Sequence, residues 1–155
     1  MPIVSNASPL IAFAAIDRLQ LLPALFESVI MPPAVALETR RAIPVAPPWL
    51  FVQDLKHPMP PVVLRRRLGD GEREAIALAA ELGVQQILLD DLPARKVARD
   101  LGLSVIGVLG VLLAAKRHGL LALVRPELEK LLRTSFFLTP QLVEELLRDA
   151  GEADS

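Results

Sequence analysis

The chain has 155 residues, a formal net charge of −1, no cysteine and a hydrophobic fraction of 52%. This length fits one domain that buries a core without disulfides, and the lack of cysteine excludes thiol redox chemistry and thiolate metal sites. The charge gives no overall basic field for nucleic acid, so any such contact has to be local. The longest apolar run, 105–115, is 11 residues long, short of the roughly 18 of a membrane span. With no basic leader at the N-terminus, we expect one cytoplasmic domain over 1–150, no membrane contact, and a flexible tail over 151–155.

The N-terminal part predicts a strand over 2–5 and then a helix over 9–16, with Ser8 as the N-cap and Pro9 at its first position. A second helix over 19–26 and a strand over 28–31 follow. Pro32 and Pro33 start a further helix, on which Glu38 lies one turn after Ala34, on the side that we expect to pack. The alternative for Glu38 is an ordinary surface ion pair with the adjacent Arg40 or Arg41.

Six prolines between positions 42 and 61 predict a long connection rather than a domain boundary. Residues 49–52 within it fit a strand at a sheet edge, and 62–68 fit a short basic helix that carries Arg65, Arg66 and Arg67. These three arginines are candidates to line an RNA path by charge. The alternative is a solvated surface run, which such charge runs more often form.

The stretch 68–91 carries the most informative acids. Asp70 is expected to cap a helix over 71–82, and Glu72 then leads its buried face, because apolar residues follow it at steps of three and four. A short buried strand over 87–89 ends in Asp90 and Asp91. A carboxylate directed at a core needs a cation, either a basic side chain or a metal ion. The alternatives are that Glu72 only stabilises the helix dipole and that Asp91 caps the next helix.

The remainder predicts helices over 92–101, 107–118 and 126–133, strands over 104–106 and 136–138, and a last helix capped by Thr139. Strands separated by helices throughout indicate an α/β fold, a three-layer α/β/α sandwich with a mainly parallel sheet. In such sheets the active crevice lies outside the carboxyl ends of the strands. Asn6 and Asp90 both follow a strand directly and occupy that location.

Four segments together resemble the PIN-domain family, in particular its VapC-like subgroup catalogued as a domain of unknown function: VSNASPLI at 4–11, MPPAVALE at 31–38, LGDGEREAIALAAELG at 68–83 and ILLDDLPARKVARDLGLSVIGVLGVLL at 87–113. The resemblance covers about residues 1–150. It implies a nuclease-like fold in which three or four acidic side chains hold one or two divalent ions and cleave RNA.

The resemblance also implies a set of site residues. Asn6 falls where the family has its first aspartate, Glu38 and Glu72 fall on the second and third acids, and Asp90 is the choice for the fourth, with Asp91 as the competing candidate. Ser8 matches a hydroxyl residue that supports the first acid. Asn6 departs from the family pattern, because an amide oxygen can bind a metal but supplies no charge, which lowers metal affinity.

The function expected from these residues is a ribonuclease dependent on Mg²⁺ or Mn²⁺, acting as a homodimer and as the toxin of a toxin–antitoxin pair with an antitoxin protein as its partner. The alternative is a catalytically degenerate PIN-fold module that binds RNA or a protein without cleavage, and Asn6 is the residue that separates the two.

Overall fold

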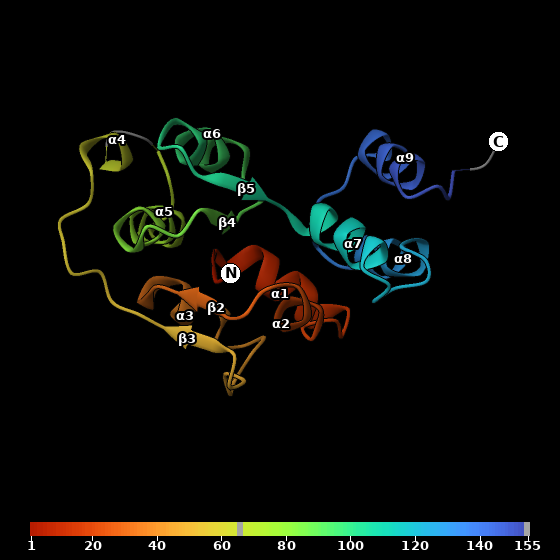
Figure 1. Cartoon of the computed structure of the whole chain (residues 1–155), viewed down its shortest axis with the longest axis horizontal. Helices are drawn as coiled ribbons and strands as arrows, with labels where there is room; N and C mark the ends of the chain where they lie inside the picture. Colours follow the sequence, from red (N-terminus) through yellow and green to blue (C-terminus); the bar gives the residue numbers. More distant parts are fainter. Residues whose placement is uncertain (65–66, 154–155) are drawn as a thin grey trace.

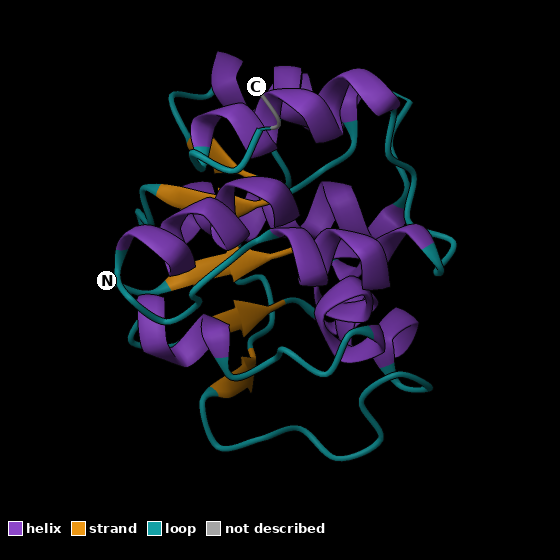
Figure 2. Ribbon diagram, turned by 90° about the vertical axis from the view of Figure 1, so that its right-hand side faces the viewer, coloured by secondary structure: helices purple, strands orange, loops and turns teal. Residues whose placement is uncertain are grey.

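The computed structural model describes residues 1–64 and 67–153. Its centre is a sheet of five parallel strands in the order β3-β2-β1-β4-β5, and their arrowheads all point to one edge in Figure 2. The strands are β1 (Ile3–Ser5), β2 (Val29–Met31), β3 (Leu50–Val52), β4 (Gln86–Leu88) and β5 (Ser104–Ile106). The residues that follow β1 and β4 therefore leave the sheet side by side at the same edge.

Helices cover the sheet on both sides. On one side α5 packs against β1, β4 and α6, and on the other α1 and α2 pack against α7 (Figure 1). The short helix α3 contacts both α5 and α1. The bounds are α1 (Ala7–Ala15), α2 (Leu21–Leu25), α3 (Pro33–Thr39), α4 (Pro61–Leu64), α5 (Asp70–Leu82), α6 (Leu92–Asp100), α7 (Val108–Arg117), α8 (Arg125–Leu132) and α9 (Pro140–Asp149). This arrangement confirms the expected α/β fold with a parallel sheet between helical layers.

The core lies on both faces of the two central strands. In β1 and β4 the apolar side chains are fully buried whichever face they point to, as parallel strands between two helical layers require. The helices complete the core with large apolar side chains such as Phe13 of α1, Ile76 of α5 and Leu112 of α7. A core closed on both sides fixes the sheet edge at which the polar residues emerge.

Two predicted helix starts are corrected. The first helix begins at Ala7 rather than Pro9, so Asn6 is its N-cap residue and Ser8 is an exposed residue of its first turn. The backbone of Asn6 is extended, with φ −80° and ψ 171°, and the helix starts directly after it. Likewise α5 begins at Asp70 with Gly69 as its N-cap, so Asp70 is a first-turn acid that favours the helix dipole and not the cap.

One prediction for the C-terminal part is also wrong. No strand forms over 136–138, because Phe136 and Leu138 pack on the core without a neighbouring strand while Phe137 is 81% exposed. In the described part of the tail, the Glu152 carboxylate accepts hydrogen bonds from Lys116 Nζ at 2.8 Å and from the backbone N of Val124 at 2.8 Å. These bonds connect Glu152 to α7 and to the N-cap residue of α8.

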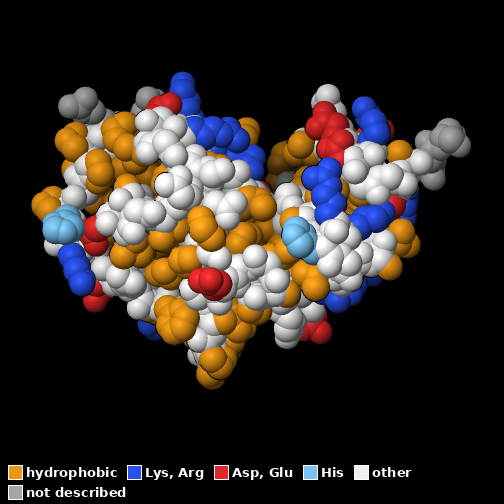
Figure 3. All heavy atoms as spheres, in the orientation of Figure 1, with side chains coloured by type: hydrophobic (Ala, Val, Ile, Leu, Met, Phe, Trp, Pro, Cys, Tyr) orange, Lys and Arg blue, Asp and Glu red, His pale blue; other side chains and the backbone are white. Residues whose placement is uncertain are grey.

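Part of the apolar surface lies at the β3 edge of the sheet. Phe51 and Val52 of β3 are exposed, as is Val45 in the segment before it, and hydrophobic side chains gather over this lower end of the molecule in Figure 3. Within the described residues, no helix has the length and apolar character to cross a membrane.

Candidate functional site

Asn6 lies at the centre of the candidate site. Its backbone N donates to the Leu88 carbonyl at 3.0 Å, which places it between the ends of β1 and β4. The residue is 3% exposed, and its side-chain Oδ1 has no hydrogen-bond partner among the described residues. Leaving a buried amide oxygen unpaired costs about 1–3 kcal/mol, so such an atom calls for an explanation, which a bound ion would provide.

Glu38 brings its carboxylate to the same place from the last turn of α3. A Cβ added to Gly71 of α5 would lie 2.5 Å from Glu38 Oε1 and 3.3 Å from Asn6 Oδ1. The two oxygens therefore lie over the same glycine, although the Glu38 side chain as a whole is exposed. The carboxylate also accepts a hydrogen bond from the Gly71 backbone.

Glu72 follows Gly71 in the first turn of α5 and is half-buried. Its carboxyl group bends back towards the start of the helix, where a Cβ added to Gly69 would lie 2.5 Å from Glu72 Oε2. This position at the positive end of the helix dipole stabilises a carboxylate. It agrees with the alternative interpretation, in which Glu72 interacts with the dipole of α5. It also lies close enough to Glu38 for the two charges to interact.

The electrostatics of Glu38 show that this corner of the molecule is acidic. Burial of its carboxyl raises the pKa of Glu38, the charge of Glu72 raises it further, and the hydrogen bond from Gly71 opposes both. Asp70 and Glu74 add smaller contributions that also raise this pKa. Carboxylates gathered in this way repel one another, and a hard cation with a preference for oxygen ligands offsets that repulsion.

Asp90 lies two residues after β4 and has other partners. Both of its carboxylate oxygens accept from the backbone N of Val108, at 3.1 and 3.3 Å, which places the carboxylate at the N-terminus of α7. Burial raises the pKa of Asp90, and the hydrogen bond from Val108 and the positive charge of Arg95 oppose that rise.

Asp91 caps the following helix. Its Oδ2 accepts from the Ala94 backbone N at 3.0 Å, and Asp91 is the N-cap residue of α6. This confirms the interpretation of Asp91 as a helix cap. Its exposed side chain is thus already engaged at the start of α6.

The described residues hold no group of three or more Asp, Glu, His or Cys side chains placed to hold a metal ion. The expected convergence of Glu38, Glu72 and Asp90 on one ion is therefore not what the structure shows. It brings the Glu38 carboxylate beside the neutral oxygen of Asn6, places Glu72 close enough to act on Glu38 by its charge, and holds Asp90 at the α7 N-terminus.

Comparison with known proteins identifies the family. The sequence model of the DUF3368 family, described as a PIN domain, matches residues 2–152. The chain belongs to the PIN-domain family. The fold of this PIN domain is similar to that of the PilT N-terminus domain protein SSO1118 from the hyperthermophilic archaeon Sulfolobus solfataricus P2, with a TM-score of 0.50 and 15% identity over 90% of this chain and 100% of that one. The search of curated proteins found no match to the sequence of this PIN domain.

The remaining predicted site residues of the PIN domain are Ser8 and the three arginines at 65–67. Ser8 is exposed in the first turn of α1, and Arg67 is exposed after α4. Arg65 and Arg66 lie outside the described residues.

Sequence reasoning missed the glycines that make room for the acids. Gly69 and Gly71 have ordinary backbone conformations at the start of α5. Glycine matters at these positions because it has no side chain, and a Cβ on either residue would meet a carboxylate oxygen. It also missed Glu74, whose Oε1 accepts from the Ala34 backbone N at 3.1 Å and ties α5 to the start of α3. The spacing of the LGDGERE segment was the available signal for all three.

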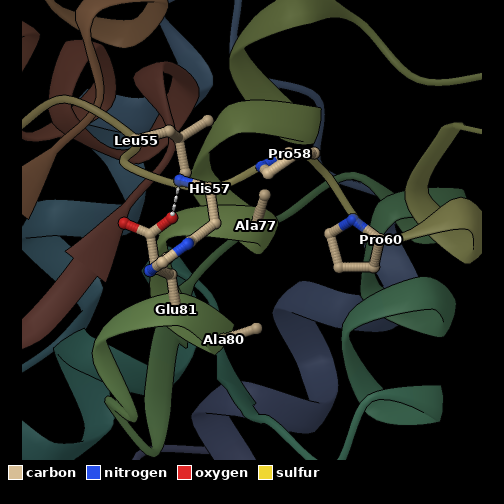
Figure 4. Close-up of a pocket in the computed structure, with 7 residues that line it drawn as sticks. All are labelled: Leu55, His57, Pro58, Pro60, Ala77, Ala80 and Glu81. Atoms are coloured by element: carbon tan, nitrogen blue, oxygen red, sulfur yellow. Dashed lines mark hydrogen bonds between the residues drawn. The ribbon is translucent and has the colours of Figure 1, made fainter.

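A separate hollow of about 250 Å³ lies between the 55–60 connection and α5 (Figure 4). Glu81 at its edge accepts from the backbone N of His57 at 2.7 Å and of Lys56 at 2.9 Å, which fixes the connection on the helix. Glu81 lies nine residues after Glu72, roughly 13 Å further along the helix axis. The hollow is therefore separate from the acidic corner.

Proposed function

We propose that this PIN domain is a ribonuclease dependent on Mg²⁺ or Mn²⁺. The observation that carries the proposal is the buried, unpartnered Oδ1 of Asn6 beside the carboxylate of Glu38. The PIN-type nuclease fold supports the same reaction class.

The residues present fit one hard divalent cation. Asn6 would supply a neutral oxygen, and Glu38 and Glu72 would supply two negative charges, a donor set of the type that Mg²⁺ and Mn²⁺ prefer. The raised pKa of Glu38 is consistent with carboxylates that lack a nearby cation. When bound, such an ion supplies Lewis-acid stabilisation of a phosphodiester and activation of water.

The chain itself supplies binding and proton transfer. Helices α1 and α7 both begin at the same sheet edge, at Ala7 and Val108, and helix N-termini favour negatively charged groups such as phosphate. We assign the acceptance of a proton through water to Glu72 or Asp90. Arg65, Arg66 and Arg67 are proposed to contact the RNA backbone by charge.

The wider role follows from the same proposal. We propose that the protein acts in the cytoplasm as the toxin of a toxin–antitoxin pair, that an antitoxin protein is its partner, and that it forms a homodimer. The exposed apolar side chains of Val45, Phe51 and Val52 at the β3 edge support self-association. Light scattering on the full chain measures the oligomeric state.

The test of the activity is manganese-dependent cleavage of a mixed-sequence single-stranded RNA. We expect Asn6→Asp to raise cleavage sharply, because it adds the missing charge, and Glu72→Gln to abolish it. Glu81→Gln is the matched control: it lies on the same helix but binds the 55–60 connection, and cleavage should not change.

One observation favours a second candidate function. With a neutral residue at position 6, the site could be a degenerate one that binds RNA or a protein partner without cleavage. If neither Asn6→Asp nor Glu72→Gln changes RNA cleavage, the binding module is the better description.

A further inference from the structure

Asp90 has a positively charged neighbour from its own chain, Arg95 of α6. Arg95 Nε donates to the Leu89 carbonyl at 2.9 Å, which fixes the guanidinium at the end of β4. A Cβ added to Gly107 would lie 2.7 Å from Arg95 Nη2 and closer still to Asp90 Oδ1. The guanidinium and the carboxylate therefore meet over Gly107, in space that only a glycine leaves open.

This pair is distinct from the acids around Asn6. The charged groups that act on the Glu38 carboxyl are Glu72, Asp70 and Glu74, whereas the one that acts on Asp90 is Arg95. The site thus has two parts. Around Glu38, the charged groups that act on its carboxyl are all acidic. At Asp90, the carboxylate already faces a positive charge, that of Arg95.

We propose that Arg95 takes the place of a second divalent cation at Asp90, so that the chain binds a single ion, held by Asn6, Glu38 and Glu72. The proposal rests on the proposed metal-dependent function and states how many ions that site takes. A guanidinium stays protonated at all working pH values, and its fixed charge repels a divalent ion from the position beside Asp90.

Arg95 is a positioning residue in this account. The Val108 backbone N holds the Asp90 carboxylate at the α7 N-terminus, and the Arg95 guanidinium provides one positive charge beside it. Removal of the guanidinium takes the fixed positive charge away from the Asp90 carboxylate and the hydrogen-bond donor away from the Leu89 carbonyl. Both oxygen groups are of the type that hard cations bind. A second ion can then enter.

The experiment is the stoichiometry of Mn²⁺ binding to the full chain, measured by equilibrium dialysis with detection of free Mn²⁺ by electron paramagnetic resonance. The wild type should bind one ion per chain and Arg95→Met two. Asp90→Asn in the Arg95→Met background should return the number to one. Arg95→Lys keeps a positive charge and should also bind one. Arg99→Met, which removes an exposed arginine of the same helix, is the matched control and should bind one.

The outcomes separate the two proposals. Two ions in the wild type, or one in a folded Arg95→Met, would overturn the role of Arg95 and leave the metal site standing. No ion in the wild type, or one that Glu72→Gln does not remove, would overturn the proposed metal site and this inference with it. Should Arg95→Met fail to fold, as judged by circular dichroism, the wild type and Arg95→Lys still decide, since two ions in either contradict the proposal.

Discussion

The Glu38 carboxylate lies directly over Gly71, so that a Cβ at position 71 would be 2.5 Å from Glu38 Oε1. Gly71 is a buried residue in the first turn of α5, and it belongs to a different element from Glu38. The absence of a side chain at position 71 therefore lets α3 and α5 bring their polar groups together beside Asn6.

Gly71→Ala should separate metal binding from folding. Alanine favours a helix over glycine by about 1 kcal/mol, so the domain should stay folded, but the new Cβ displaces Glu38 and crowds Asn6 Oδ1. We expect about a tenfold loss of Mn²⁺ affinity, measured by calorimetric titration. Gly110→Ala in α7 is the matched control, because its Cβ would meet only Ile106. An unchanged affinity in Gly71→Ala would remove Glu38 from the site.

Asn6→Asp should lower the stability of the metal-free protein and increase its response to metal. The substitution buries a carboxylate beside Glu38, which costs free energy until a cation binds. A bound ligand stabilises the fold by RT ln(1 + [L]/Kd), about 2.7 kcal/mol at one hundred times Kd. Thermal unfolding with and without Mn²⁺ should therefore show a larger shift of Tm for Asn6→Asp than for the wild type. Equal shifts would argue against a metal ligand at position 6.

Asp91→Ala should cost stability and leave metal binding intact. Loss of the cap of α6 costs about 1 kcal/mol, which chemical denaturation measures. The Mn²⁺ affinity should not change, because the Asp91 carboxylate is engaged with Ala94. Asp91→Ser retains a capping oxygen and should retain most of the stability. A tenfold drop in Mn²⁺ affinity in Asp91→Ala would make Asp91 a ligand after all.

Glu127 should contribute to acid stability away from the site. Burial alone would raise its pKa, but hydrogen bonds from Arg18 and Lys130 outweigh that effect and lower the pKa. An acid whose folded pKa is lowered stabilises the protein above its unfolded pKa of about 4.3, and this stability is lost as the pH falls through the folded value. Glu127→Gln should therefore be less stable than the wild type at pH 7, and the difference should shrink in acid.

Urea denaturation at several pH values between 3 and 7 measures this dependence. Glu129→Gln replaces an exposed acid of the same helix and serves as the control, with little change expected. A difference between Glu127→Gln and the wild type that persists undiminished at pH 3 would show that Glu127 acts by packing and not by charge.

Most of the fold could be predicted from the sequence, because local patterns determine it. Apolar runs such as 87–89, which lies between glutamine and aspartate, indicate buried strands, and prolines at positions 33 and 140 mark helix starts. The positions of Asn6 and Asp90 at one sheet edge followed from the same topology. The apolar run at 136–138 was misleading, because Phe136 and Leu138 pack on the core without a neighbouring strand.

The candidate site could be predicted only in part. Strand order predicts which residues reach the edge, but the direction of each side chain depends on the packing between elements. Glu38 meets Asn6 only because α3 packs against α5, and Asp90 and Arg95 both lie in the space that Gly107 leaves. Neither contact has a signature in local spacing.

The central claim is that Asn6, Glu38 and Glu72 hold a divalent ion together. The most direct measurement is anomalous diffraction from a crystal of the full chain grown with Mn²⁺. We predict one anomalous peak per chain, bounded by Asn6 Oδ1 and the carboxylates of Glu38 and Glu72. Absence of a peak between these three side chains, or a peak beside Asp90 alone, would contradict the account.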